Sequence, residues 1–590
     1  MRFVALAADY DNTIATDGKV AERTWQALDR LRQSGRHLIL VSGRELDDLR
    51  TVCPRLDLFS RVVAENGGVL YHPDRGERRL LAPAPPKTFV DSLRKHGLHR
   101  FSVSETLVAT MKPNEQIALE VIRDLGLDLH VVFNGDAVMI LAPGVTKASG
   151  LRAALDELGL SSLNVVGVGD AENDHPLLDA CGFSVAVENA LPALKAHADW
   201  VTQHANGRGV SELADALVQD DLRSRASALD KCKVLLGHRH AERGDQPVML
   251  DAHGTTALLA GPSGGGKSTV TAALLERLDR AGYQACIFDP EGDYGHEGGL
   301  VALGDAHTTP SLDSAVQLLG TAKQSVAVNL LRVPLLERPR YCASLLLRLQ
   351  AMRVQTGRPH WLVFEEAHQL FPADWHPADE SLPSMLETAL AVTVHPDQVA
   401  PALLRQINVA LVTGAHADKT LAAFAQALGR EAPRLQTAPT LERGQLLVWH
   451  PAPNAHGDRG GITYVVDVEP GTTQRRRHHR KYAEGLLIPE RSFYFRGPEG
   501  KLNLRAHNLI LFLEIADGVD PDTWQFHLKR GDYSRWFGEV IGDEDLAEEA
   551  RAIEQAKALD PHASRARIRA AVERRYTQPE NPSLPPMRAP

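Results

Sequence analysis

Apolar and polar positions follow two alternating periods along the first third of the chain. Short apolar runs are each followed by a stretch in which apolar residues recur every three or four positions, the period of an amphipathic helix. The pairs are FVALAA (3–8) with a helix near 21–34, HLILV (37–41) with a helix near 45–52, and NVVGV (164–168) with a helix near 174–180. This βαβ succession predicts an α/β fold with a parallel sheet covered by helices.

The succession is interrupted between residues 82 and 138, where the pattern becomes mixed. This interval opens with the proline-rich break APAPPK (82–87). We expect it to form an α+β subdomain inserted into a Rossmann-like core of residues 1–81 and 139–218. A polar, charge-mixed stretch from Gln219 to Asp230 is predicted to be a linker.

A second α/β pattern is predicted for residues 233–488. Its apolar strands are TTALLAG (255–261), ACIFD (285–289), WLVFEE (361–366), VALVTGAH (409–416) and QLLVWHP (445–451). Residues 489–576 are expected to form a small C-terminal domain that starts with alternating SFYFR (492–496) and ends in a single long charged helix. The proline-rich tail 577–590 is predicted to be disordered.

Composition narrows the class of protein. A chain of 590 residues has room for about four domains. Lys and Arg number 65 against 75 Asp and Glu, so the net charge of −10 excludes a chain that is basic throughout, and nucleic acid would need a local patch. Five cysteines without a CxxC spacing favour a reducing cytoplasm over a disulfide scaffold or a zinc site. Because a signal peptide and a membrane-spanning apolar run are both missing, we expect a cytoplasmic protein without membrane contact.

Pairs of acidic residues follow two of the predicted strands of the first sheet. Asp9 and Asp11 stand directly after the first strand, and Asp170 and Asp174 follow NVVGV. The carboxyl ends of parallel strands meet at the edge where α/β sheets bind ligands, so we expect these carboxylates to face one point. There, one acid could attack phosphorus while another shuttles a proton, and gathered oxygen ligands suit Mg²⁺. The alternative for each motif alone is an N-cap or turn.

Phosphate-binding groups accompany these acids. Ser42-Gly43-Arg44 offers a hydroxyl and backbone N–H groups at the predicted start of a helix, which is a cradle for an anion. Lys147, in GVTKASG, supplies a positive charge, although a solvated surface lysine is the simpler alternative. All of these motifs fall at strand ends of one predicted sheet, which favours a phosphatase site.

The motifs DYDNT, SGR, Lys147 and GDAEND resemble, in that order, those of the haloacid dehalogenase (HAD) superfamily of phosphatases. The resemblance implies that Asp9 is the nucleophile that becomes an aspartyl phosphate and that Asp11 is the general acid and base. It also implies that Ser42 and Lys147 bind the phosphoryl group. The further residues assigned to this site are Thr13, Gly43 and Asn173 for phosphate binding, and Asp9, Asp11, Asp170 and Asp174 for Mg²⁺.

Two features make the chain similar to the subgroup that contains sugar-phosphate and phosphoglycolate phosphatases. These are AENGG (64–68) and an insert after the second motif, which is then the cap at residues 82–138. A cap roofs the site and excludes water and bulky polymers. We therefore expect a small phosphorylated metabolite or nucleotide as the substrate.

A phosphate-binding pattern marks the second α/β region. The sequence GPSGGGKS (261–268) fits GxxxxGK[ST] between a predicted strand and helix. Its glycines let backbone N–H groups approach the phosphates of ATP, Lys267 meets the β and γ oxygens, and Ser268 can ligate Mg²⁺. The residues assigned to ATP are Gly261, Gly264, Gly265, Gly266, Lys267, Ser268, Thr269 and Glu365, with Ser268 also a metal ligand.

Two acids end the strand in WLVFEEAH (361–368). Glu365 is expected to bind the Mg²⁺ shell, and Glu366 to polarise the attacking water as a catalytic residue. The alternative is a helix that starts with acids because its dipole favours them. With FDPEGDY (288–294), these motifs resemble the HerA–FtsK group of P-loop motor ATPases. The resemblance implies a homo-oligomeric ring, a hexamer, with an arginine from the neighbour at each ATP site, for which Arg405, Arg430 and Arg434 are candidates.

The one strongly basic run is RRRHHRK (475–481). We favour a solvated face for it, with a nucleic-acid phosphate contact as the alternative. The predicted function is a Mg²⁺-dependent phosphomonoester phosphatase fused to an ATP-hydrolysing module. Two rivals stay open: a HerA-like nucleic-acid motor whose first domain trims ends, and a bifunctional kinase/phosphatase.

Overall fold

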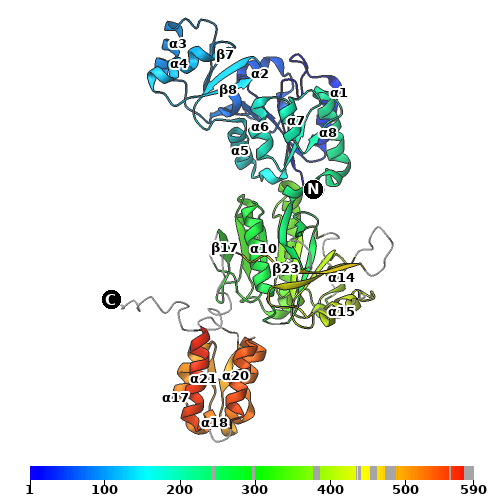
Figure 1. The fold of residues 1–590 in the computed structure, drawn as a ribbon, viewed down its shortest axis with the longest axis vertical. Helices are drawn as coiled ribbons and strands as arrows, with labels where there is room; N and C mark the ends of the chain where they lie inside the picture. Colours follow the sequence, from blue (N-terminus) through cyan, green and yellow to red (C-terminus); the bar gives the residue numbers. More distant parts are fainter. Residues whose placement is uncertain are drawn as a thin grey trace.

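The computed structural model describes residues 1–227, 229–240, 246–262, 264–295, 299–375, 386–433, 435, 440–451, 461–471, 487, 489–541, 543–556 and 560–576. Three modules follow one another along the long axis of the molecule (Figure 1). The run 475–481, Arg434 and the tail 577–590 lie outside the described residues. Within those ranges no helix combines the length and the apolar character needed to cross a membrane.

The first module contains the parallel sheet that the apolar runs predict. Its strand order is β12-β11-β10-β1-β2-β3-β4-β5, with β12 to β3 parallel and β4 and β5 antiparallel at one edge. The strands are β1 (Ala5–Ala8), β2 (His37–Val41), β3 (Arg61–Ala64), β4 (Val69–His72), β5 (Glu77–Leu80), β10 (Val165–Gly169), β11 (Phe183–Ala186) and β12 (Trp200–Val201). Every residue of β1 and β10 is buried, because helices cover both faces of the sheet.

The helices of this module form amphipathic layers on the sheet. They are α1 (Glu22–Gln33), α2 (Leu46–Val52), α5 (Lys147–Leu158), α6 (His175–Ala180), α7 (Pro192–His197), α8 (Asn206–Asp220) and α9 (Arg223–Ala226). In α1, Trp25, Leu28 and Leu31 recur at helical spacing and are buried against the core. The register of apolar positions thus fixes which face of each helix covers the strands.

The stretch 219–230 is not the linker that its polar composition predicts. Half of it is helical, in the end of α8 and in α9. Leu222 and Ala226 are fully buried in the core of the first module, and Asp221 accepts a hydrogen bond of 2.8 Å from the buried guanidinium of Arg36. The prediction was wrong because charged residues surround these few buried apolar residues, so the sequence shows no clear helical period of apolar positions.

The cap is an antiparallel sheet with the order β6-β7-β9-β8 and two helices. Its elements are α3 (Lys87–Lys95), β6 (Ser102–Val103), β7 (Leu107–Met111), α4 (Glu115–Leu125), β8 (His130–Asn134) and β9 (Ala137–Leu141). Phe89 and Val121 from the helices pack with Val138 and Ile140 of β9 in a separate core. Since β9 continues to Leu141, the last strand of the cap crosses the predicted limit at residue 138.

The second module is built on one sheet with the order β14-β13-β23-β22-β21-β15-β20-β19-β16-β18-β17. The strands are β13 (Lys233–Arg239), β14 (Pro247–Asp251), β15 (Thr256–Ala260), β16 (Ala285–Asp289), β17 (Leu300–Leu303), β18 (Ser325–Asn329), β19 (Trp361–Phe364), β20 (Ala389–Thr393), β21 (Val409–Val412), β22 (Gln445–His450) and β23 (Ile462–Val468). The helices are α10 (Lys267–Arg280), α11 (Leu312–Gly320), α12 (Arg338–Thr356), α13 (Ala367–Leu370), α14 (Pro401–Leu404) and α15 (Ala417–Ala427). From β21 to β17 all pairs are parallel, so their carboxyl ends share one edge.

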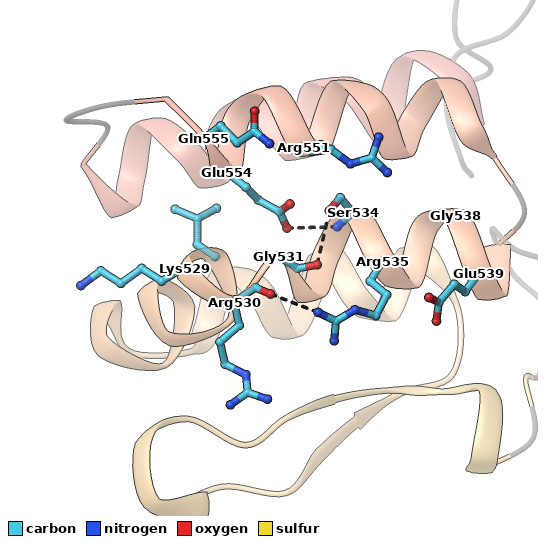
Figure 2. Close-up of a pocket in the computed structure, with 11 residues that line it drawn as sticks. Lys529, Arg530, Gly531, Ser534, Arg535, Gly538, Glu539, Arg551, Glu554 and Gln555 are labelled. Atoms are coloured by element: carbon cyan, nitrogen blue, oxygen red, sulfur yellow. Dashed lines mark hydrogen bonds between the residues drawn. The ribbon is translucent and has the colours of Figure 1, made fainter.

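The third module packs helices on a short hairpin around an aromatic core. Its elements are β24 (Phe493–Phe495), β25 (Leu504–Ala506), α17 (Leu509–Gly518), α18 (Pro521–Arg530), α19 (Asp532–Trp536), α20 (Glu544–Glu554) and α21 (Pro561–Tyr576). The single long charged helix predicted here is therefore two helices, and Pro561, which has no N–H, begins the second. A hollow of about 580 Å³ is lined by α20, α19 and the end of α18. Figure 2 draws its lining residues, among which Glu554 accepts a hydrogen bond of 3.0 Å from the backbone N–H of Ser534.

The first and second modules meet at the amino ends of their strands. Asn164 stands directly before β10, and His360 directly before β19. The Nδ1 of His360 accepts the backbone N–H of Gln284 at 2.9 Å, and its Nε2 lies 2.9 Å from Asn164 Oδ1. Burial, with Arg358 nearby, lowers the pKa of His360 to about 3, so the imidazole is neutral and its Nε2 donates to Asn164. Arg358, itself buried, donates to the carbonyl of Gly159 in the first module.

Candidate active sites

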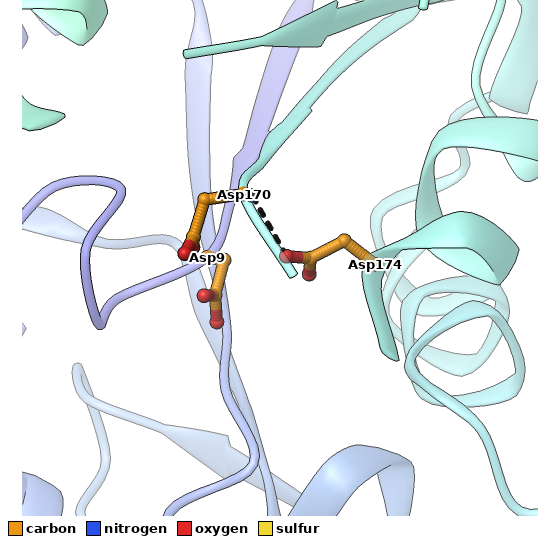
Figure 3. Close-up of side chains that lie close together, drawn as sticks. All are labelled: Asp9, Asp170 and Asp174. Carbon is orange, nitrogen blue, oxygen red and sulfur yellow. Dashed lines mark hydrogen bonds between the residues drawn. The ribbon is translucent and has the colours of Figure 1, made fainter. Parts of the chain in front are cut away.

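Three carboxylates meet at the carboxyl edge of the first sheet. Asp9 follows β1, Asp170 follows the neighbouring strand β10, and Asp174 ends a short 3-10 turn after it. Figure 3 shows the three side chains together, and one oxygen from each lies within 4.8 Å of the others. Asp174 Oδ2 accepts the backbone N–H groups of Asp170 and Ala171, both at 3.0 Å, which fixes its orientation. In the described part of the chain this is the group of His, Cys, Asp and Glu side chains that could hold a metal ion.

Lys147 binds two of these three carboxylates. It begins α5, and a capping box between Thr146 and Ser149 fixes the start of that helix. Its Nζ donates to Asp9 Oδ1 at 2.7 Å and to Asp174 Oδ1 at 2.6 Å, and the side chain is fully buried. The simpler alternative of a solvated lysine is therefore wrong.

The charges in the cluster are unbalanced. Burial raises the pKa of Asp9 well above its usual value; Lys147 opposes this shift, and Asp174 and Asp170 add to it. Burial also raises the pKa of Asp170 to about 6. Burial lowers the pKa of Lys147, but the carboxylates of Asp174 and Asp9 outweigh it, and the net shift is upward. Three carboxylates facing one ammonium group leave an excess of negative charge, and oxygen donors of this kind fit Mg²⁺.

The side chains of Asp11 and Thr13 both form hydrogen bonds with other residues of this site. Both oxygens of Asp11 accept hydrogen bonds from the guanidinium of Arg44, at 2.6 and 2.7 Å, and Asp11 is not one of the three clustered carboxylates. A role for Asp11 in binding Mg²⁺ stays a prediction. The hydroxyl of Thr13 is buried and donates to Asp170 Oδ1 at 2.7 Å, so Thr13 orients this carboxylate; its role in phosphate binding stays a prediction.

The predicted phosphate cradle lies beside this cluster, under the cap. The hydroxyl of Ser42 is buried and accepts the backbone N–H of Arg44 at 3.2 Å. A Cβ at Gly43 would lie 3.3 Å from the sulfur of Met139 in the cap and 3.5 Å from Asn173 Nδ2. Gly43 thus allows the core loop to approach Met139 of the cap closely.

A cavity of about 450 Å³ lies between core and cap. Asn66 and Asn173 line its floor, and the cap contributes Lys112, Glu115 and Phe133. Asn173 donates to Asn66 Oδ1 at 3.1 Å, while its own Oδ1 is buried and accepts no hydrogen bond among the described residues. A buried acceptor of this kind is costly unless a ligand or water satisfies it. The cavity therefore offers a buried hydrogen-bond acceptor at the boundary between core and cap.

Two residues at this site carry roles that sequence reasoning missed. Arg44 belongs to the SGR motif, but its ion pair with Asp11 joins two loops that are distant in the sequence. Glu65, in AENGG, is buried and its Oε2 accepts bonds of 2.7 to 2.8 Å from Thr106 N, Thr106 Oγ1 and Ser104 Oγ of the cap. The positive φ of 53° at Glu65 turns the chain toward these donors. The motif AENGG therefore anchors the cap to the core.

We expect Mg²⁺ to raise the thermal stability of the protein more at pH 7.5 than at pH 5. The pKa of Asp170 is about 6 in the folded protein against a usual value of 3.8. Between these values the folded state binds more protons than the unfolded state, so the stability of the metal-free protein falls as pH rises. Metal must displace those protons at low pH. At a concentration 100 times its Kd, a ligand stabilises by about 2.7 kcal/mol.

Differential scanning fluorimetry with and without MgCl₂ measures this difference. Asp170→Asn should lose most of the Mg²⁺-induced shift in Tm, and the exposed control Asp17→Asn should keep it. Equal shifts at both pH values would contradict the prediction.

The second motif-bearing loop lies at the carboxyl edge of the second sheet. It leads from β15 into α10, whose first residues are Lys267, Ser268 and Thr269; Ser263 lies outside the described residues. Gly261 has a φ of 154°, and a Cβ there would meet Thr413 Oγ1 at 2.2 Å. Gly264 and Gly266 have φ of 75° and 92°, in the region that favours glycine. Glycine is thus required by the path of this loop.

Lys267 lies at the centre of this loop. Its Nζ donates to the carbonyls of Gly261 and Pro262, both at 2.9 Å. Burial lowers its pKa, and the carboxylates of Glu366, Glu365 and, more weakly, Glu291 oppose that shift. A desolvated ammonium group held by weak neutral acceptors is ready to exchange them for an anion.

The two acids after β19 face this lysine. Glu365 accepts a hydrogen bond of 2.5 Å from the hydroxyl of Tyr294, and Glu366 has the positive φ of 44° at the start of α13. Non-glycine residues in this conformation are strained and cluster at functional sites. His368 Nδ1 lies 3.5 Å from Glu366 Oε2. Burial is the main cause that lowers the pKa of this histidine to about 4.

The arginines suggested for a neighbour's site lie elsewhere in the module. Arg430 donates to the carbonyl of Pro451 at 2.6 Å, and Arg405 is exposed at the end of α14. Their action on a second subunit stays a prediction from the resemblance.

The similarity to known proteins lies in the first module. Residues 6–121 and 107–213 match the model of the haloacid dehalogenase-like hydrolases. The phosphoglycolate phosphatase of Methanothermobacter thermautotrophicus is 35% identical over 217 residues, with coverage of 35% of this chain and 96% of that protein. That of Archaeoglobus fulgidus is 33% identical over 211 residues, with coverage of 35% and 94%. The crystal structure of a haloacid dehalogenase-like hydrolase from Bacteroides thetaiotaomicron, 18% identical, covers 36% of this chain and 99% of its own, with a TM-score of 0.33.

Proposed function

The chain belongs, through residues 6–213, to the haloacid dehalogenase-like hydrolases, and we propose that its first module is a Mg²⁺-dependent phosphatase for a small phosphomonoester. The observation that carries this proposal is the buried cluster in which Lys147 bridges Asp9 and Asp174 beside Asp170. An anion-binding ammonium next to a carboxylate nucleophile is what phosphoryl transfer to an enzyme requires.

The proposed reaction proceeds in two steps. An oxygen of Asp9 attacks phosphorus, the new oxygen–phosphorus bond forms, and the bond to the leaving oxygen breaks with its electron pair. Asp11, once it has separated from Arg44 and taken up a proton from solvent, gives that proton to the leaving oxygen. Asp11 then takes a proton from water, which attacks the aspartyl phosphate and frees Asp9. Throughout, Ser42 and Lys147 bind the phosphoryl oxygens.

Asp9, Asp170 and Asp174 are the residues that would hold Mg²⁺ in this module. When bound, the ion supplies positive charge that offsets the phosphoryl oxygens and the clustered carboxylates. Thr13 holds Asp170 toward the cluster, and the two backbone N–H groups at residues 170 and 171 hold Asp174. The protein thus fixes two of the three ligands before the ion arrives.

Phosphoglycolate is the first substrate to test, since the relatives from two archaea carry that activity in their names. The cavity under the cap suits a compound of this size, and Lys112 supplies a cation for a carboxylate. Its Nζ lies 5.3 Å from the centre of the Phe133 ring, which keeps it at the cavity. Sugar phosphates are the other class that the resemblance names.

Phosphate release from phosphoglycolate and a panel of sugar phosphates and nucleotides tests the proposal. We expect turnover with Mg²⁺, loss of it with excess EDTA, and recovery when Mg²⁺ is restored, because the metal charge is needed against the carboxylate cluster. Malachite-green detection measures the released phosphate. Equal release with and without EDTA would show that the cluster does not work through a divalent cation.

We further propose that the second module, within the predicted limits 233–488, binds and hydrolyses ATP. Support comes from the strand, loop and helix that contain the described residues 260–262 and 264–268, the buried Lys267, and the two carboxylates that face it. In this proposal Lys267 meets the terminal phosphates, Ser268 and Glu365 hold Mg²⁺, and Glu366 polarises water. A HerA–FtsK-like hexameric ring stays a prediction from the resemblance, as do the limits 489–576 for the C-terminal domain. Mass photometry tests the ring.

A further inference from the structure

The C-terminal domain touches the second module through Arg491. This residue ends the 3-10 turn Pro489–Arg491 directly before β24. Its guanidinium forms an ion pair with Glu291 of the second module, while its carbonyl accepts a hydrogen bond of 3.0 Å from Trp536 Nε1. Trp536 belongs to the aromatic core of the C-terminal domain. Arg491 is therefore fixed to one module through its backbone and to the other through its side chain.

Glu291 belongs to the loop that follows β16, at the same sheet edge as Lys267. Asp289 shapes this loop, because its Oδ1 accepts the N–H of Glu291 at 3.2 Å and its Oδ2 accepts the N–H of Tyr294 at 2.9 Å. The hydroxyl of Tyr294 in turn donates to Glu365 at 2.5 Å. A continuous series of contacts thus leads from Arg491 to the carboxylate proposed to hold Mg²⁺.

The charges at this junction act on the nucleotide site itself. Glu291 opposes the downward shift in the pKa of Lys267. Arg491 and Lys267 both lower the pKa of His368, after the larger effects of burial and His395. A second guanidinium, the buried Arg338, binds Gln369 of α13. The ion pair of Arg491 therefore lies at the rim of the site, within the field of its catalytic lysine.

We propose that Arg491 is a positioning residue of the nucleotide site, and that the C-terminal domain controls nucleotide turnover through it. By binding Glu291, it holds the loop 289–294 so that Tyr294 orients Glu365. This inference rests on the proposed ATPase function. Because the ion pair of Arg491 is with the loop 289–294, which positions Glu365, its loss should lower kcat more than it raises KM. Misplacement of a reacting group by about 1 Å can cost up to about 100-fold in rate.

Steady-state ATP hydrolysis by the full-length protein tests the inference. The variants are Arg491→Ala, Arg491→Lys, Glu291→Gln and the double variant Arg491→Ala/Glu291→Gln. We expect Arg491→Ala to lower kcat about tenfold or more with KM within about twofold, and Arg491→Lys to recover part of the loss. The double variant should be no slower than the worse single one, because both changes break one interaction.

Arg567→Ala is the matched control, since it removes an exposed arginine of the same domain on α21. A purely structural anchor would lower Tm in Arg491→Ala without changing kcat, and that outcome overturns the inference, as do additive effects in the double variant. Lys267→Ala assayed in parallel separates the two claims. If the wild type hydrolyses ATP no faster than Lys267→Ala, the proposed ATPase fails and the inference fails with it. If the wild type is faster and Arg491→Ala equals the wild type, only the inference fails.

Discussion

The Asp9→Asn protein is expected to release phosphate from phosphomonoesters at least about 10⁴-fold more slowly than the wild type. Asn keeps the size of the side chain and still accepts a hydrogen bond from Lys147, but its amide oxygen is a poor nucleophile and carries no charge for Mg²⁺. The change removes the attacking oxygen without emptying the buried site, so the fold should persist. Phosphate release under saturating substrate and Mg²⁺ measures the effect.

Asp17→Asn is the matched control for this experiment. It makes the same chemical change at an exposed position eight residues away, where a φ of 49° is one that Asn tolerates as readily as Asp. This control should match the wild type. ATP hydrolysis by the Asp9→Asn protein should also be unchanged, since the two sites lie in separate modules. Substantial phosphatase turnover without Asp9 would show that another group attacks phosphorus.

The Lys267→Ala protein should lose ATP hydrolysis by about 100-fold or more, the scale found when one preorganised charge at a transition state is removed. In the structure Lys267 is buried and its ammonium group donates to two carbonyls of its own loop, so it is placed to meet terminal phosphates. Alanine removes that charge but keeps the helix start. A coupled assay for ADP measures the loss.

Lys419→Ala, which removes an exposed lysine of α15 in the same module, should leave hydrolysis at the wild-type rate. Phosphatase activity should stay within about twofold in both variants. If Lys267→Ala hydrolyses ATP as fast as the control, the proposed nucleotide site is wrong. If labelled γ-phosphate appears on an acceptor instead of in solution, the kinase alternative gains support.

The sequence predicted the site correctly where its acidic residues stand directly after parallel strands. Asp9, Asp170 and Asp174 could be expected to converge because parallel strands bring their carboxyl ends to one edge, and the HAD resemblance is confirmed over residues 6–213. Lys147 could be assigned only through the family motif, because nothing in its surroundings along the chain indicates that it is buried.

Contacts between distant loops were beyond such reasoning. Arg44 and Asp11 are 33 residues apart, and Arg491 and Glu291 are 200 apart, with no period or spacing that links them. The same limit applies to Glu65, whose partners are in the cap. The predicted linker at 219–230 failed for another reason: two buried apolar residues among many charged ones are too few to produce a visible helical period.

The contact of Asn164 with His360 affects whether a reaction product can move from one proposed site to the other. Each site lies at the carboxyl edge of its sheet, whereas the modules join at the amino edges, so the two sites open in opposite directions. The strands β10 and β19, of five and four residues, lie between them, which at about 3.3 Å per residue amounts to roughly 30 Å. If both proposed sites act, a product released from one must travel through solvent to reach the other. Any benefit of joining them in one chain must come from shared location or shared regulation, not from a tunnel.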